Sequence, residues 1–294
     1  FRFRMLSHII GPEAQVRKVI DRVRNATLVE DKRAGLAELA NIAKTEPVAA
    51  SISFQTIVPM LHEKKDDGEM VRSILETITC CLSSSSNAAG NAQGSEPLST
   101  VFAKEQNYIT TLLDLLEERD WGIRLGVLRI LNILASDRLS ALQQAVLSAP
   151  QGLARLMDVL GDSEIIRNEV LLVMVALTKG NSEVQKIMAF EGAFDSLFAI
   201  VKEEEEGSII LDDCMTIINN LLHNNQSNAI FFREMAGVSS HLVPLMNRPA
   251  TGGPGWEQLW LRLLDTVGNL LPPPAPTPTP PTHPPPRGAA PPLP

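Results

Sequence analysis

The sequence predicts an all-α protein, an armadillo-like right-handed helical solenoid of about five three-helix repeats. Three observations predict it: apolar segments with an asparagine recur at a fixed interval, glycines recur at nearly the same interval, and the apolar composition is aliphatic. Of the 294 residues, 44% are hydrophobic but only 4% are aromatic. The apolar residues are mostly Leu, Ile, Val, Ala and Met, a set that suits helix-on-helix packing better than a β-sheet.

The clearest sign of a repeat is the interval between the apolar segments that contain an asparagine. Asn132, the equivalent Ala176 and then Asn220 follow one another at steps of 44 residues, and Asn269 comes 49 residues later. A step of about 40 to 47 residues is typical of helical repeats of the armadillo and HEAT type. Such repeats stack, so that each unit buries its apolar face against the next.

Glycines keep nearly the same step. Gly152, Gly192 and Gly237 lie 40 and then 45 residues apart, each after a short helix-like segment. This position predicts that each glycine ends a helix in the left-handed conformation. Apolar residues between these marks recur at the helical spacing of i, i+3, i+4 and i+7. One repeat is therefore predicted to contain three helices, at 108–118, 122–136 and 140–148.

The chain divides into three predicted parts. Residues 1–15 are an N-terminal extension, residues 16–271 are the solenoid, and residues 272–294 are a proline-rich disordered tail. The tail holds 13 of the 21 prolines, which cannot continue a helix. Within the solenoid, a run of Ser, Asn and Gly at residues 83–97 has no apolar period and predicts a flexible insertion.

The last predicted helix, at residues 256–271, carries an apolar face and is followed directly by proline. The end units of a solenoid need a polar outer face to stay soluble. We therefore expect exposed apolar surface at this end, and with it either further repeats, a bound partner or self-association. The apolar positions are Leu259, Trp260, Leu263, Leu264, Val267 and Leu270.

Composition and spacing argue against several classes of function. A formal net charge of −8 disfavours binding to nucleic acid, which needs clustered Lys and Arg. The five histidines are scattered, and the three cysteines have neither disulfide nor metal-ligand spacing, so we expect no metal and reduced thiols, as in the cytosol. Cys214 is expected to pack in the core. Because no phosphate-binding loop, nucleophile elbow or membrane-spanning run is present, we predict a protein with no cofactor and no enzymatic activity.

The recurring asparagines are the most informative polar positions. In an armadillo solenoid the third helix of each repeat lines a concave groove, where an Asn amide can hold the backbone of an extended peptide. Asn132, Asn220 and Asn269 are therefore candidate groove residues, although an Asn near a helix end can also satisfy local backbone groups. Three arginines in the same predicted helices are either groove residues or ion-pair partners of nearby glutamates. They are Arg124, Arg129 and Arg167.

Several long stretches carry a more specific signal than the period. The sequence at 111–118, 152–158, 165–169, 185–194, 212–214 and 219–222 resembles the head domain of the general vesicular transport factor family, the Uso-type vesicle tethers of the Golgi. A weaker match at 21–33 extends the resemblance to the N-terminal part of the chain.

This resemblance implies an armadillo-like head, a long parallel coiled-coil tail and an acidic end in a homodimeric tether. Such a tether is peripheral on Golgi membranes and docks transport vesicles in endoplasmic reticulum to Golgi traffic before SNARE-mediated fusion. Family heads are linked to Rab GTPases and vesicle coats, whereas SNAREs and golgins are contacted mainly through the tail. The chain has no sustained heptads, so we expect that it lacks the tail.

Two other classes fit an armadillo scaffold. One is a cochaperone that exchanges the nucleotide of Hsp70, and the other is a peptide-binding adaptor. An adaptor of the nuclear-import type would need an Asn four residues after Trp in the third helices, and Trp121, Trp256 and Trp260 have none. The resemblance favours the tether.

Overall fold

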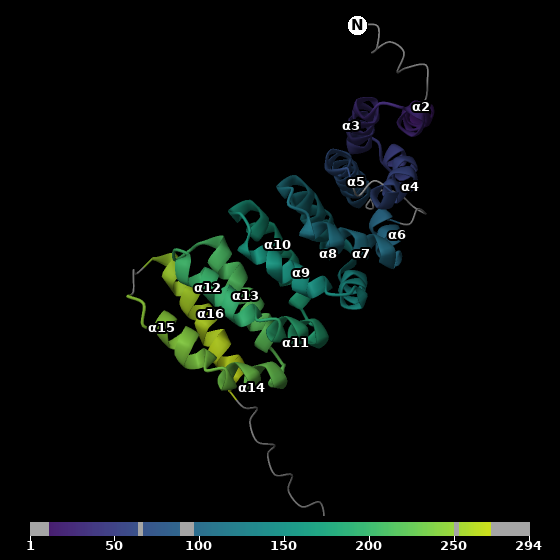
Figure 1. Cartoon of the computed structure of the whole chain (residues 1–294). Helices are drawn as coiled ribbons and strands as arrows, with labels where there is room; N and C mark the ends of the chain where they lie inside the picture. Colours follow the sequence, from purple (N-terminus) through teal and green to yellow (C-terminus); the bar gives the residue numbers. More distant parts are fainter. Residues whose placement is uncertain (1–11, 64–66, 89–96, 250–252, 272–294) are drawn as a thin grey trace, which may run out of the picture.

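The computed structural model describes residues 12–63, 67–88, 97–249 and 253–271. In this part of the chain every regular element is a helix, which confirms the predicted all-α class. The helices follow one another from α2 at one end of the molecule to α16 at the other, as expected for a solenoid (Figure 1).

Among the described residues, the solenoid starts with two units of two helices each. The first pairs α2 (Pro12–Asn25) with α3 (Val29–Thr45), and the second pairs α4 (Pro47–Glu63) with α5 (Gly68–Ala88). Proline begins α2 and α4, where its missing N–H costs no helical hydrogen bond. Residues 12–15, which the sequence assigned to the N-terminal extension, are therefore helical.

Four units of three helices follow. The long α8 (Trp121–Ser148) bends at Arg138, whose φ of −142° and ψ of 49° are not helical, so its halves belong to successive units. In the described ranges the units thus number four triplets and two pairs, where the sequence predicted about five triplets. Their other members are α6 (Leu98–Lys104), α7 (Gln106–Asp114), η1 (Leu115–Glu117), α9 (Gly152–Asp158), η2 (Val159–Gly161), α10 (Glu164–Thr178), α11 (Ser182–Phe190), α12 (Ala193–Glu203), α13 (Ile209–Leu222), α14 (Gln226–Glu234), η3 (Val238–Leu242), α15 (Val243–Met246) and α16 (Pro254–Leu270).

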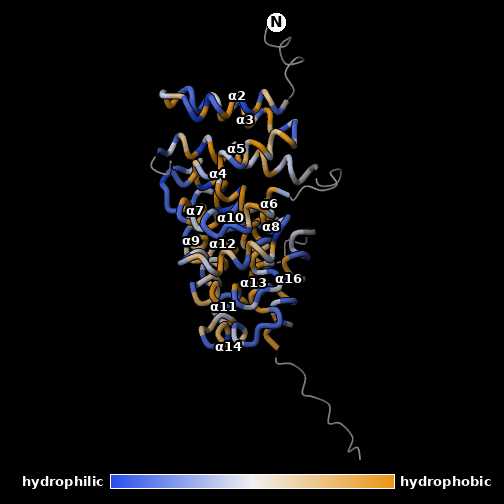
Figure 2. The backbone as a smooth tube through the Cα atoms, turned by 90° about the vertical axis from the view of Figure 1, so that its right-hand side faces the viewer, coloured by the Kyte–Doolittle hydropathy of each residue, from blue (hydrophilic) through white to orange (hydrophobic). Residues whose placement is uncertain are grey.

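One long helix from each unit packs on its counterpart in the next. We call these the ladder helices: α3, α5, the first half of α8, α10, α13 and α16. Hydrophobic and hydrophilic segments alternate along the stack in the side view of Figure 2. The buried side chains form one continuous core that runs from Val16 to Leu270. Stacking, rather than a compact centre, therefore supplies the hydrophobic burial.

The predicted flexible insertion at 83–97 is partly wrong. Helix α5 continues to Ala88, so that the serines following residue 82 are helical. Ser84 is buried, and the Ser85 hydroxyl accepts a hydrogen bond of 3.1 Å from the backbone N–H of Leu98. Packing against α6 thus overrides the weak helix propensity of serine. Residues 89–96 of the predicted insertion lie outside the described residues.

The predicted left-handed glycines are only partly confirmed. Gly192 has a φ of 87°, as expected, but at the other two positions the preceding residue takes this conformation: Gln151 with φ 55° and Ala236 with φ 60°. Gly152 and Gly237 are required by close packing instead. A Cβ atom would lie 2.9 Å from a backbone oxygen at Gly152 and 2.5 Å from an aromatic carbon at Gly237.

The predicted exposed face at the end of the solenoid is confirmed only in part, because three of the six predicted apolar positions, Leu259, Leu263 and Leu270, are buried. Leu259 and Leu263 of α16 are buried, whereas Leu261 and Leu264 are 58% and 57% exposed, and Leu271, which caps the helix, is 64% exposed. Apolar surface of this kind favours association.

We expect the replacement of Leu261 and Leu264 by Glu to abolish concentration-dependent self-association without lowering stability, since both side chains are already in water. Sedimentation velocity over a range of concentrations measures this, with Leu172→Glu, an exposed site on α10, as the control. A wild-type chain that stays monomeric at every concentration would contradict the expectation.

Candidate protein-binding surface

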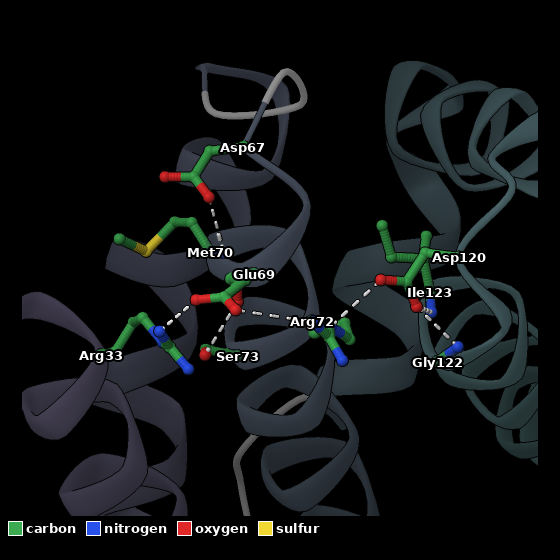
Figure 3. Close-up of polar contacts among 9 residues, drawn as sticks. All are labelled: Arg33, Asp67, Glu69, Met70, Arg72, Ser73, Asp120, Gly122 and Ile123. Atoms are coloured by element: carbon green, nitrogen blue, oxygen red, sulfur yellow. Dashed lines mark hydrogen bonds and ion pairs between the residues drawn. The ribbon is translucent and has the colours of Figure 1, made fainter. Parts of the chain in front are cut away.

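Ion pairs join the N-terminal ends of successive ladder helices, about one for each step of the solenoid. Arg33 of α3 pairs with Glu69 of α5, and Arg72 of α5 lies 3.3 Å from the carboxylate of Asp120, at the start of α8 (Figure 3). The later steps repeat the arrangement. They are Arg124–Asp162 at 2.8 Å and Arg167–Glu204 at 3.3 Å, whereas at the last step Arg262, in the middle of α16, pairs back to Asp212 of α13 at 2.8 Å.

Asp120 shows how these pairs fix the ends of the helices. One carboxylate oxygen accepts hydrogen bonds from the backbone N–H groups of Gly122 at 2.8 Å and Ile123 at 3.4 Å, while the other faces Arg72 (Figure 3). It therefore caps α8 and ties it to α5. A Cβ on Gly122 would lie 2.8 Å from the Arg72 side chain, so the glycine leaves room for the pair.

The three predicted arginines divide into two groups. Arg124 and Arg167 make the ion pairs above, and Arg124 also donates 2.9 Å to the carbonyl of Glu118. Arg129 is exposed and makes no ion pair with a residue in the described part of the chain. Glu204 also accepts a hydrogen bond of 2.7 Å from the Ser208 hydroxyl, so its carboxylate is held by two side chains.

Asn132 and Asn220 use their amide N–H groups inside the solenoid. Asn132 donates to the carbonyl of Glu169 at 3.2 Å and to its carboxylate at 2.8 Å, which links α8 to α10. Asn220 donates to the carbonyl of Val175 at 3.3 Å and to the Thr178 hydroxyl at 3.0 Å, which links α13 to α10. Their side-chain oxygens accept no hydrogen bond from a described residue.

Asn269 lies beside a depression between α13 and α16. Its amide donates 3.3 Å to the side-chain oxygen of Asn219, and its own oxygen lies 3.3 Å from Nδ1 of His223. The depression has a volume of about 580 Å³ and is also lined by Leu264 and Asp265. The asparagines therefore hold neighbouring ladder helices together, and Asn220 lines the same depression as Asn269.

Two adjacent aspartates on α13 have carboxyl pKa values that are shifted in opposite directions. Asp212 receives hydrogen bonds of 2.8 and 2.9 Å from the Arg262 guanidinium, and these lower the pKa of its carboxyl group. Burial raises the pKa of Asp213, and the charge of Asp212 raises it further. Asp213 therefore carries its charge in the folded protein at a cost.

We expect Asp213→Asn to be more stable than the wild type at neutral pH, by a few tenths of a kcal/mol, because solvent screens a half-buried charge. As the pH falls through the raised pKa, the wild-type carboxyl becomes neutral and the difference vanishes. Thermal unfolding across this pH range measures the difference in stability between the variant and the wild type. Asp212→Asn is the matched control and should be destabilised instead, while a gain that persists at acidic pH would contradict the assignment.

Sequence reasoning missed a second set of polar residues, on the first helices of the units. Gln143, Gln185 and Asn228 are buried and lie 42 and 43 residues apart. Each donates to backbone carbonyls near the end of a ladder helix, for example Asn228 to Leu221 at 2.8 Å. Because their interval matches that of the repeat, the sequence alone could have identified them if the recurrence of Gln as well as Asn had been considered.

Within the described ranges, no helix is long and apolar enough to cross a membrane, and no three His, Cys, Asp or Glu side chains are grouped so as to hold a metal ion. Cys214 is fully buried, and burial raises its pKa to about 12, which confirms a packing position.

Known proteins resemble the chain in sequence, although no family model matches it. Over 212 residues it is 38% identical to Golgin candidate 6 of Arabidopsis thaliana, and over 230 residues it is 35% identical to human general vesicular transport factor p115. The chain is a homologue of the general vesicular transport factors. These alignments cover 69% and 74% of the chain but only 23% and 24% of the two relatives. The chain thus spans about a quarter of the length of these transport factors.

The fold agrees with this relationship. A crystal structure of Uso1 superposes with a TM-score of 0.79, covering 90% of this chain and 46% of the other at 24% identity. At this identity the likeness shows the fold alone. The resemblance to vesicular transport factors and the predicted solenoid are both confirmed.

Proposed function

We propose that this chain is the protein-binding head of a vesicle tether. It would act without catalysis in endoplasmic reticulum to Golgi and intra-Golgi transport, docking vesicles on Golgi membranes before SNARE-mediated fusion. The observation that carries this proposal is the 35% identity to p115 over 230 residues of the solenoid. In this reading residues 16–271 are one head domain, which acts at the cytoplasmic surface of the Golgi as a peripheral, homodimeric protein.

The concave side of the ladder helices is the proposed contact surface. Arg129 is exposed and unpaired among the described residues, and the side-chain oxygens of Asn132 and Asn220 are free to accept. Arg124, Arg167 and Asn269 support this surface through their contacts inside the solenoid. The partners expected for a tether head are a Rab GTPase or a vesicle coat, whereas SNAREs and golgins fall to other parts of the full-length tether.

Depletion of the full-length protein, followed by rescue, tests this function. We expect undocked transport vesicles to accumulate near the Golgi and the wild-type protein to restore docking. Arg129→Glu should restore docking poorly and Lys186→Glu, an exposed site on α11, should restore it fully. Normal secretory traffic after depletion, with a protein found only in the cytosol, would overturn the proposal.

A further inference from the structure

A row of exposed apolar side chains lies along one edge of the solenoid. Trp121, Ile165 and Ile209 are 58%, 59% and 76% exposed, and they follow one another at steps of 44 residues. Each lies in the first turn of a ladder helix, on α8, α10 and α13 respectively. We call these three residues the apolar ridge. Single exposed apolar residues are ordinary, but one at the same place in three successive repeats forms a continuous feature.

The ion pairs between the ladder helices hold this ridge in place. Trp121 directly follows Asp120, which caps α8 and pairs with Arg72 (Figure 3). Ile209 directly follows Ser208, whose hydroxyl accepts a hydrogen bond of 3.2 Å from the backbone N–H of Ile210 and donates one of 2.7 Å to Glu204. Before Ile165, the pair Arg124–Asp162 fixes the chain. The ridge is thus presented on rigid helix ends, which lowers the entropy lost on binding.

The charged residues that lie within a few positions of the ridge residues in the sequence are mainly acidic. The acidic partners of the arginines are already neutralised, but further exposed carboxylates make no ion pair with a described residue. Two cations, Arg119 and Lys202, lie among them. The unpaired carboxylates are Glu118, Glu164, Glu203 and Glu205.

We propose that the apolar ridge docks a basic amphipathic helix of a partner protein. Packed helices lie about 8–10 Å apart, so the ridge residues repeat at that interval. An α-helix rises about 10.5 Å over seven residues, which brings its side chains back to nearly the same face at a matching interval. The fitting partner therefore carries apolar residues at i, i+7 and i+14, with Lys and Arg beside them to face the carboxylates.

The negative charge beside the ridge also disfavours two other binding partners. An anionic membrane surface would be repelled by the unpaired carboxylates. A second copy of the chain would bring the same negative edge. The proposal concerns the edge of the solenoid rather than its concave side, so it stands or falls independently of the proposed function.

A synthetic helical peptide with Leu at seven-residue intervals, flanked by Lys and Arg, is the probe. We expect saturable binding to the wild-type chain by fluorescence anisotropy, weakened by salt. The triple variant Trp121→Ser, Ile165→Ser, Ile209→Ser should lose binding about tenfold or more while keeping its melting temperature. The matched control Leu172→Ser, Ile187→Ser, Ile230→Ser removes three exposed apolar side chains elsewhere and should bind normally.

The variant Glu118→Gln, Glu164→Gln, Glu203→Gln, Glu205→Gln keeps the ridge and removes its charge, so it should bind more weakly and with less dependence on salt. Absence of saturable binding to the wild type, or equal binding by the ridge variant, would overturn the proposal. The proposal would also be overturned if the wild type bound vesicles or associated with itself and the triple ridge variant did not. The ridge would then bind lipid or a second copy of the chain.

Discussion

Replacement of Phe232 by alanine is expected to destabilise the solenoid by about 3–5 kcal/mol, the usual cost of removing a buried aromatic ring. Phe232 is fully buried on α14, and its ring centroid lies 4.8 Å from that of Phe194 and 5.9 Å from that of Phe198. These rings join the last two units of the solenoid. The loss should therefore be felt first in α14 and α16.

Urea unfolding measures the free energy, and hydrogen exchange shows where the structure opens. The neighbouring Phe231 is 39% exposed, so Phe231→Ala is the matched control and should cost much less. Similar losses for the two variants would mean that α14 is rotated from the position described here.

Replacement of Gly237 by alanine is the second change with a large expected effect, about 1–3 kcal/mol of destabilisation. The backbone of Gly237 is ordinary, with φ −57° and ψ −32°, so alanine adds no backbone strain. The added Cβ would instead lie 2.5 to 2.7 Å from three ring carbons of Phe232. The loss is therefore expected to come from steric overlap alone.

Gly268 is the control for this variant, because no atom lies within 4 Å of the Cβ that alanine would add. Gly268→Ala should be neutral or slightly stabilising, since alanine favours the helix. Combining Gly237→Ala with Phe232→Leu should cost less than the sum of the two changes, because a smaller side chain makes room. Strict additivity in chemical denaturation would contradict the contact.

The sequence predicted the solenoid because each repeat has to bury the same apolar positions. That requirement leaves a period in the chain, and the recurrence of Asn132 and Asn220 at 44-residue steps follows it. Exposed apolar surface on α16 was predictable only in part, because the helix packs on α13 and buries Leu259, Leu263 and Leu270, while Leu264 is exposed.

Features that depend on contacts between units were not predictable in the same way. The position of Gly237 suggested a helix end, but the structure requires a glycine there because the ring of Phe232 leaves no room for a Cβ atom. Ser84 suggested a loop by its type, but packing buries it in a helix. The partners of Arg124 and Arg167 lie 37 or 38 residues further along the chain, where only the fold brings them close.

The central claim, that this solenoid is the docking surface of a vesicle tether, is tested most directly in a reconstituted endoplasmic reticulum to Golgi transport reaction. Under this claim the purified chain should compete with the complete tether for its partners, because it would offer the docking surface while its sequence holds no sustained heptads for a long coiled coil. We predict dose-dependent inhibition of vesicle docking, relieved by an excess of complete tether. Undiminished docking at a large excess of the folded chain would contradict the claim.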